Sequence, residues 1–275
     1  KISNGKWIWW SRGIGGRSAL DYLIKVKGYS FLEAVETIIG HTAIQAPVYE
    51  KPQSKEENKP LLLPEKCASN RVITEYLFGR GIDFEIINYC ISNDLIFESL
   101  PYHNVVFVGY DEKKEPKYAA YRSTNKRRIM GDCSGSKKDY SFRLGKENLE
   151  EVHLFECAID LLSYATLAKL NGQDWKEMSF VSLSGVYSPA KKIEDSKVPI
   201  ALEKYLGSNP SVRKIRIHFD NDIAGRKAAQ TLKTILPDKY EIVDEPPKAG
   251  KDFNDFLCMR MGIYNKKTHE RNEER

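Results

Sequence analysis

The chain has 275 residues, of which 41% are hydrophobic and 29% charged, a balance typical of globular proteins and not of collagen, coiled coils or disordered chains. Its length suits one large domain or two smaller ones. The net charge of +5 permits a polyanionic partner without requiring one. No apolar run approaches the roughly 20 residues that cross a bilayer, and no signal peptide opens the chain, so we expect a cytoplasmic protein without a membrane partner. Because the chain begins with Lys1, we expect a fragment or a processed protein.

The N-terminal residues 1–45 are predicted to form a small separate unit. Tryptophan and glycine residues between Asn4 and Ile14 suit a short hairpin followed by a turn. Apolar residues at helical spacing from Arg17 to Ile39 predict two amphipathic helices that are broken at Gly28. Residues 46–63 are rich in proline and polar residues, cannot bury apolar area, and are predicted to be a linker.

Residues 64–150 are predicted to form a small α+β subdomain. Helices are expected at about 70–78 and 84–90, separated by a break at residues 79–81. The apolar period then changes to two, which predicts strands at 105–108 and 118–121 around a polar loop at 111–114.

Residues 151–264 alternate between strand and helix patterns. Strands are expected at 152–155, 179–183, 212–219 and 240–243, and helices at about 158–170, 225–236 and 252–261. This alternation predicts a mainly parallel, α/β sheet with helices on its faces. Residues 265–275 are nearly all polar and are predicted to be a frayed tail.

Acidic residues follow three of these four predicted strands. They are, in chain order, Glu156 and Asp160, then Asp220 and Asp222, then Asp252 and Asp255. Ligands of open parallel sheets bind at the carboxyl ends of the strands, so we expect these carboxylates to converge. Their mutual repulsion calls for a cation, and Mg²⁺ or Mn²⁺ suits oxygen ligands. Two such ions would support phosphoryl transfer.

Each acidic cluster also has a structural explanation. An isolated D-x-D is commonly a turn or a helix cap, and a glutamate after a strand commonly neighbours a helix N-cap. His218 lies within a predicted strand and is expected to be a packed residue rather than a metal ligand. Three clusters on one predicted edge favour the metal site.

Four segments together resemble the TOPRIM domain of bacterial primases, topoisomerases and some nucleases. They are FECAID at 155–160, SLSG at 182–185, HFDNDIAGR at 218–226 and KDFND at 251–255. The resemblance implies that Glu156, Asp220 and Asp222 are catalytic and bind metal, that Asp252 also binds metal, and that Asp160 and Asp255 support them. One departure is Cys157, which stands where the family has glycine.

The middle region resembles the core of primases. EYLFGRGI at 75–82 is similar to the opening of that core, and AAYR at 119–122 is similar to a segment that brings a basic residue to template and nucleotide, which matches Arg122. YSFRL at 140–144 loosely resembles a further segment and contains Arg143. Independently, residues 117–146 hold nine basic and two acidic residues, a net charge of +7 that suits nucleic acid, with a solvated basic loop as the alternative. Residues expected to bind nucleic acid or triphosphate are Arg122, Lys126, Arg127, Arg128, Arg143, Arg226 and Lys251.

The N-terminal unit resembles the second half of a primase zinc-binding domain, but the two cysteine positions fall at Trp10 and Gly13. We therefore expect no zinc there and expect Trp7, Trp9 and Trp10 to fill the space by apolar packing. The five cysteines of the chain form no CxxC pair, so neither disulfides nor a cysteine zinc site is expected, and we expect reduced, mostly buried thiols.

The resemblance implies a primase-like protein, of the type found in mobile elements, with a degenerate zinc-domain remnant. Its expected activity is that of a primase-type DNA-directed RNA polymerase, which joins ribonucleoside triphosphates into short RNA primers on single-stranded DNA and works beside a replicative helicase. The alternatives are a TOPRIM-type nuclease and a non-catalytic, nucleic-acid-binding accessory protein.

Overall fold

The computed structural model describes residues 2–3, 6–12, 14–30, 33–34, 37–38, 59–125, 127–185, 187, 189–190 and 192–263. The chain divides into two compact units, Lys1–Glu57 and Asn58–Arg275. Most of the predicted linker, the predicted tail and parts of the second N-terminal helix lie outside the described residues. Among the described helices, none combines the length and the apolarity that crossing a bilayer requires.

The first unit contains a three-stranded antiparallel sheet and a helix. The strands are β1 (Ile2–Ser3), β2 (Lys6–Trp9) and β3 (Ile14–Gly16), which pair in this order. Helix α1 (Ala19–Lys27) begins at Ser18, whose hydroxyl accepts the Asp21 N–H, and ends at Gly28 with a left-handed φ of 73°. The predicted break at Gly28 is therefore confirmed, because glycine adopts this conformation without a steric penalty.

The tryptophans of this unit do not share one role. Trp7 contacts the Tyr22 ring edge-on, with centroids 5.3 Å apart, and its indole N–H donates to the Ser18 carbonyl at 3.0 Å. Trp9 is 37% exposed and carries the Arg12 guanidinium 4.5 Å from its ring centroid. The expectation that Trp9 fills the interior is wrong, and the side chain of Trp10 lies outside what the structure describes.

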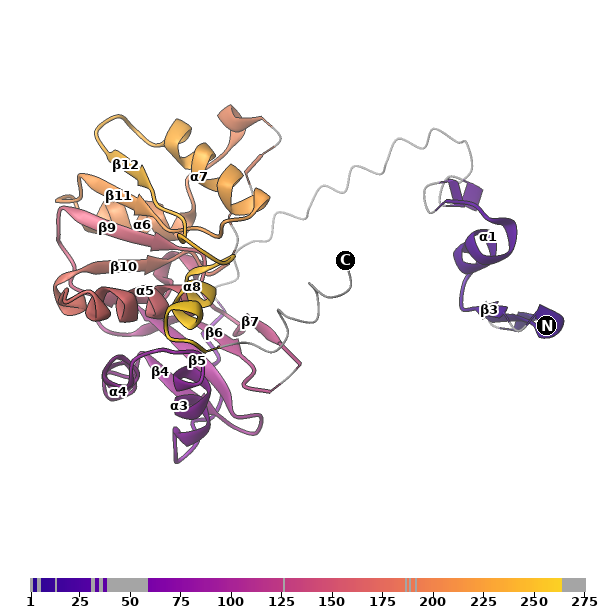
Figure 1. Cartoon of the computed structure of the whole chain (residues 1–275), viewed down its shortest axis with the longest axis horizontal. Coiled ribbons are helices and arrows are strands. Elements are labelled where there is room, and N and C mark those ends of the chain that lie inside the picture. Colours follow the sequence, from indigo (N-terminus) through magenta and orange to yellow (C-terminus); the bar gives the residue numbers. More distant parts are fainter. Residues whose placement is uncertain are drawn as a thin grey trace. The chain divides into compact units, whose positions relative to one another are not determined.

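The second unit is built on a five-stranded sheet in the order β12-β11-β9-β10-β8. Figure 1 shows the first four of these strands side by side. Strands β9 (Glu151–Phe155), β10 (Ser179–Ser182), β11 (Lys214–Ile217) and β12 (Glu241–Asp244) are parallel, and β8 (Arg143–Gly145) is antiparallel to β10. The predicted parallel α/β arrangement is thus confirmed. The predicted boundary between two subdomains at residue 150 stays a prediction. Strand β8 lies before this boundary in the sequence but belongs to the same sheet as the strands after it.

Helices cover both faces of this sheet because its strands are apolar on both faces. Val152 and Leu154 pack with α6 (Ile200–Ser208) and α7 (Ile223–Ile235). Phe155 and Phe180 point the other way and pack with α5 (Ala158–Leu170) and α8 (Phe253–Arg260). Helix α6 is absent from the sequence-based prediction, because it is short and contains Gly207 near its end.

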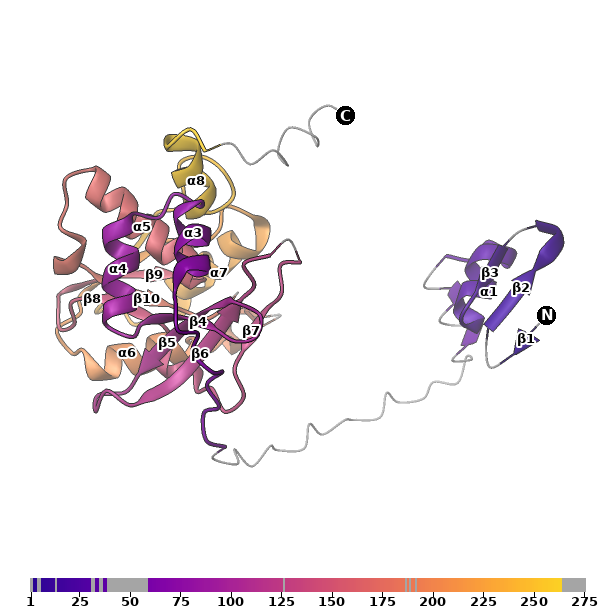
Figure 2. The same ribbon diagram turned by 90° about the horizontal axis from the view of Figure 1, so that it is seen from below.

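The second sheet of this unit is antiparallel, in the order β4-β5-β6-β7. Its strands are β4 (Ile96–Ser99), β5 (Asn104–Tyr110), β6 (Pro116–Arg122) and β7 (Met130–Asp132). Helices α3 (Arg71–Phe78) and α4 (Phe84–Ser92) lie side by side next to β4 (Figure 2). Their apolar residues share one core with α5 and α8, so the two sheets form a continuous body.

Two further side-chain expectations are tested here. His218 is packed as predicted: it is 1% exposed, stacks on Phe155, and bonds through Nε2 to Nδ1 of His153 at 2.8 Å. Burial lowers the pKa of both rings, that of His153 to about 4. All five cysteines are free, but only Cys90 and Cys258 are buried, so the expectation of mostly buried thiols is wrong.

Alanine substitutions at two glycines should change stability in opposite directions. A Cβ at Gly109 in β5 would lie 1.7 Å from the Tyr140 carbonyl oxygen, whereas at Gly207 nothing lies within 4 Å. We expect Gly109→Ala to lose at least about 2 kcal/mol of unfolding free energy and Gly207→Ala to gain roughly 0.5–1 kcal/mol, because alanine favours a helix. Urea denaturation followed by circular dichroism measures both, and equal stability of the two variants would contradict this packing.

Candidate functional site

The site begins where the parallel strands of the five-stranded sheet end. Glu156 follows β9, Asp220 and Asp222 lie in the loop after β11, and Asp252 follows β12. The Asp220 backbone N–H donates to Glu156 Oε1 at 3.2 Å. The short distance between Glu156 and the Asp220 backbone depends on Gly225. A Cβ at this position would lie 2.2 Å from the Asp220 carbonyl oxygen and 3.0 Å from Glu156 Oε1. The structure therefore brings the predicted glutamate to the predicted D-x-D loop.

Two of the aspartates are also helix caps. Asp222 Oδ1 accepts the Gly225 N–H at 2.9 Å at the start of α7. Asp252 Oδ1 accepts the Asp255 N–H at 2.7 Å at the start of α8. The structural explanation from the sequence thus holds for one oxygen of each carboxylate, and the second oxygen of Asp222 faces Lys251.

Lys251 supplies the cation of this site. Its Nζ lies 2.9 Å from Asp220 Oδ2 and 3.3 Å from Asp222 Oδ2. Hydrogen bonding to Asp220 raises the pKa of Lys251, so the ammonium stays charged. The phosphate-binding role expected of this lysine stays a prediction, and in the structure its ammonium bridges the two aspartates.

Burial sets the protonation of the deeper carboxyls. Glu156 is 5% exposed, and burial followed by repulsion from Asp220 raises its pKa to about 7. Burial and then repulsion from Asp252 raise the pKa of Asp160 to about 7 as well. The Gly225 N–H instead lowers the pKa of Asp222. Neighbouring carboxyl groups thus have pKa values that are shifted in opposite directions, which is typical of functional sites.

A network behind the acids holds α8 against α5. Asp160 accepts the Asn254 N–H at 3.2 Å and the Cys157 thiol at 2.8 Å. The Asn254 side chain bonds Ser163 Oγ at 3.0 Å and both the carbonyl and the guanidinium of Arg80 at 2.9 Å. Sequence analysis named no role for Asn254 or Arg80, although both lie in the quoted motifs. Asp255 accepts the Lys251 N–H at 3.3 Å, and burial raises its pKa.

The donor set suits a hard divalent ion, since the groups here that could bind a cation are carboxylates. The carboxylates are nevertheless spread out. We looked among the described residues for three or more acidic, histidine or cysteine side chains whose ligand atoms all lie within 4.8 Å of one another. The group that meets this condition is Cys67, Glu98 and His103, and it contains none of the acids of this edge. An ion at the acidic edge would therefore keep several water ligands, as Mg²⁺ commonly does.

The predicted basic residues fall into different environments. Arg122 donates from Nε to Tyr76 Oη at 3.1 Å and lines a pocket of about 290 Å³, together with Lys138, Cys157 and Ser184. This pocket is largely apolar and borders the start of α5, next to Glu156. Arg122 is thus, with Lys251, one of the predicted basic residues that lie beside the acidic edge.

Two other arginines are occupied by structural contacts. Arg226 donates to the carbonyls of Phe219 and Asp220 and pairs with Asp244 at 2.6 Å, so it supports the D-x-D loop. Arg143 lies over the Tyr205 ring and donates to the Asp139 carbonyl. Arg127 and Arg128 are exposed, and Lys126 lies outside the described residues.

Two known protein families match parts of the second unit. Residues 153–257 match the family described as Toprim-like, and residues 75–148 match a family described as a protein of unknown function (DUF3991). The acidic edge belongs to a Toprim-like domain. This confirms the predicted TOPRIM subdomain, which follows a small α+β region. No curated protein matches the chain.

Three primase structures are among the solved structures to which this chain is similar. The primase fragment of the bacteriophage T7 primase-helicase is 18% identical over 70% of this chain and 72% of that chain, with a TM-score of 0.46. The zinc-binding and RNA polymerase domains of Aquifex aeolicus primase are 16% identical over 94% and 71%, with a TM-score of 0.42. The catalytic core of E. coli primase is 12% identical over 74% and 72%, with a TM-score of 0.44.

The raised pKa of Glu156 predicts a pH-dependent stability. Its carboxyl titrates near 4.5 when unfolded and near 7 when folded, so between these values the folded state binds more protons and stability falls as pH rises. We expect Glu156→Gln to remove on the order of 2 kcal/mol of the loss between pH 5 and pH 8. Denaturant titrations in EDTA measure this, with the exposed Glu203→Gln as control. Parallel stability curves for Glu156→Gln and the native chain would contradict the prediction.

Proposed function

We propose that this protein is a primase-like nucleotidyl transferase that makes short RNA primers on single-stranded DNA from ribonucleoside triphosphates. The observation that carries the proposal is the hydrogen bond between Glu156 and the Asp220 backbone, at the acidic edge of a Toprim-like domain. This contact joins the two acidic motifs at the carboxyl ends of neighbouring strands, where sheets of this type bind ligands.

Mg²⁺ or Mn²⁺ would be held by Glu156, Asp220, Asp222 and Asp252, and would supply Lewis-acid stabilisation of the reacting phosphate. The chain's own residues prepare this site. Glu156 holds the backbone of the D-x-D loop, and Arg226 fixes the same loop from behind through two carbonyls. Lys251 balances the aspartates until a cation arrives, and its ammonium then becomes available to a phosphate oxygen.

The template and the triphosphate would meet the basic side of the site. Residues 117–146 carry a net charge of +7, and this segment contributes Arg122 and Lys138 to the pocket beside Cys157. Cations bind a phosphate backbone through counterion release, without reading sequence. The charge of this segment therefore supports single-stranded DNA as the partner.

One observation favours a second candidate, a non-catalytic protein that binds nucleic acid. Lys251 already neutralises part of the charge of Asp220 and Asp222, so the cluster holds together without a metal ion. In such a protein the acids would serve only as helix caps and ion-pair partners, while the basic segment binds DNA.

Asp220→Asn separates these functions. In the primase, the substitution should lower incorporation of labelled ribonucleotides on single-stranded DNA with Mn²⁺ by at least about 100-fold, because it removes a charge at the reacting centre. DNA binding should change little. The exposed Asp238→Asn serves as control and should keep full activity.

The same assay identifies the alternatives. Shortening of the labelled template that depends on Asp220 would indicate a nuclease. DNA binding without incorporation or cleavage, by the native chain and the variant alike, would indicate the accessory protein and overturn the proposal.

A further inference from the structure

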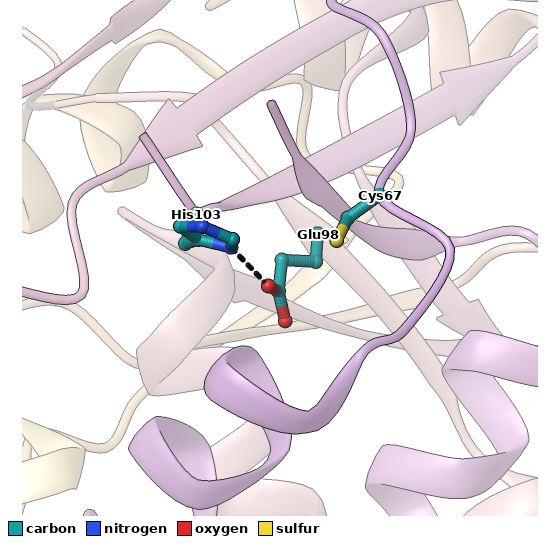
Figure 3. Close-up of side chains that lie close together, drawn as sticks. All are labelled: Cys67, Glu98 and His103. Carbon is teal, nitrogen blue, oxygen red and sulfur yellow. Dashed lines mark hydrogen bonds and ion pairs between the residues drawn. The ribbon is translucent and has the colours of Figure 1, made fainter. Parts of the chain in front are cut away.

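Three side chains with different ligand chemistry meet away from the acidic edge. They are the Cys67 thiol, the Glu98 carboxylate and the His103 imidazole (Figure 3). One ligand atom from each lies within 4.8 Å of the other two. Cys67 comes from the segment before α3, Glu98 from β4, and His103 from the turn that follows β4.

The backbone around each residue is fixed by hydrogen bonds. Cys67 donates its N–H to the Glu98 carbonyl at 2.7 Å, and Lys66 pairs with Ser99 as an additional antiparallel bridge at the edge strand β4. His103 donates its N–H to the Ser99 carbonyl at 2.8 Å and accepts the Thr124 hydroxyl at 3.0 Å. The three side chains therefore project from a rigid frame.

Glu98 is the centre of the group. It is 2% exposed, and its Oε2 accepts the N–H groups of Val72 and Ile73 at the start of α3, at 2.9 and 3.3 Å. Its Oε1 lies 2.5 Å from His103 Nδ1. Helix capping and this pair explain Glu98 and His103, but they do not explain why a thiol lies beside them.

We propose that Cys67, Glu98 and His103 bind a zinc ion, with a water as the fourth ligand. Sulfur, nitrogen and oxygen donors together suit Zn²⁺, whereas Mg²⁺ prefers oxygen alone. Zinc bonds of roughly 2.0–2.3 Å place tetrahedral ligands about 3.3–3.8 Å apart, so small side-chain movements would close the group around the ion. The half-exposed imidazole leaves room for entry, since 46% of the His103 side chain is accessible.

Binding would replace existing interactions in a defined way. The ion takes the place of the hydrogen bond between His103 Nδ1 and Glu98 Oε1, the ring proton moves from Nδ1 to Nε2 through solvent, and the thiol releases its proton to solvent. Glu98 Oε2 keeps its bonds to α3. The ion would thus link the segment before α3 to the end of β4 and to the turn that follows it.

Co²⁺ titration of the full chain tests the proposal, because a cobalt–thiolate bond gives a near-ultraviolet charge-transfer band that an all-oxygen site lacks. We expect one equivalent to bind with this band, and Cys67→Ser to abolish it. Cys133→Ser and Cys157→Ser are the controls, since both residues are free cysteines with the same intermediate exposure as Cys67, and both should keep the band. Absence of the band in the native chain, or its loss in Cys157→Ser instead of Cys67→Ser, would overturn the proposal.

A second readout uses zinc itself and His103, whose exposed side chain can be replaced without emptying the core. Zn²⁺ should raise the melting temperature of the native chain, and His103→Gln should weaken zinc binding at least about 10-fold while its circular dichroism without metal is unchanged. An equal zinc-dependent rise in the native chain and His103→Gln would show that the ion binds elsewhere.

Discussion

The parallel pairing of β9 with β11 is the constraint on which the acidic edge depends. Its register sets Leu154 beside Ile217, so the two strands end together and the chain leaves both on the same side of the sheet. Glu156 and Asp220, 64 residues apart in sequence, then come within one hydrogen bond of each other. The inward residues Leu154 and Ile217 are fully buried under α6 and α7, and this apolar packing holds the charged ends in register. The repulsion between acids is thus opposed by hydrophobic burial a few residues away.

Several kinds of contact reduce the repulsion between the carboxylates at this edge. Backbone N–H groups at the starts of α7 and α8 bind one oxygen each of Asp222 and Asp252. The Lys251 ammonium pairs with Asp220 and Asp222. Asp160 is more deeply buried, and it accepts hydrogen bonds from the Asn254 amide and the Cys157 thiol. Glu156 is buried and faces two neighbouring aspartates with one backbone hydrogen bond to its carboxylate, so burial first and repulsion second explain its raised pKa. The N-terminal ends of these helices also favour negative charge, because their N–H groups and dipoles point toward the carboxylates.

The sequence predicted the elements that depend on local pattern and missed those that depend on tertiary partners. The strand ends carrying Glu156 and Asp220, and helix α5 at Ala158–Leu170, follow from periodicity alone. The roles of Lys251, Arg226 and Arg143 could not be predicted, because surface position and charge do not reveal which carboxylate or carbonyl a long side chain will reach. The exposed Trp9 was missed for a similar reason, as an aromatic residue signals burial only on average. The Cys67, Glu98 and His103 group joins a segment before α3 to a strand and a turn, and its spacing matches no sequence motif.

The buried histidine pair beneath the sheet edge makes more contacts than it has ring protons. His218 Nδ1 faces the Glu245 carbonyl oxygen at 3.1 Å, and its Nε2 faces His153 Nδ1 at 2.8 Å. His153 Nε2 in turn lies 3.2 Å from a Glu151 carboxylate oxygen, to which Arg216 also donates. The oxygens at both ends of this chain can only accept, and two neutral imidazoles hold two protons between them, so two of the three contacts can be hydrogen bonds. A third proton would complete the chain from β12 through β11 to β9, and burial opposes it by lowering the pKa of both rings.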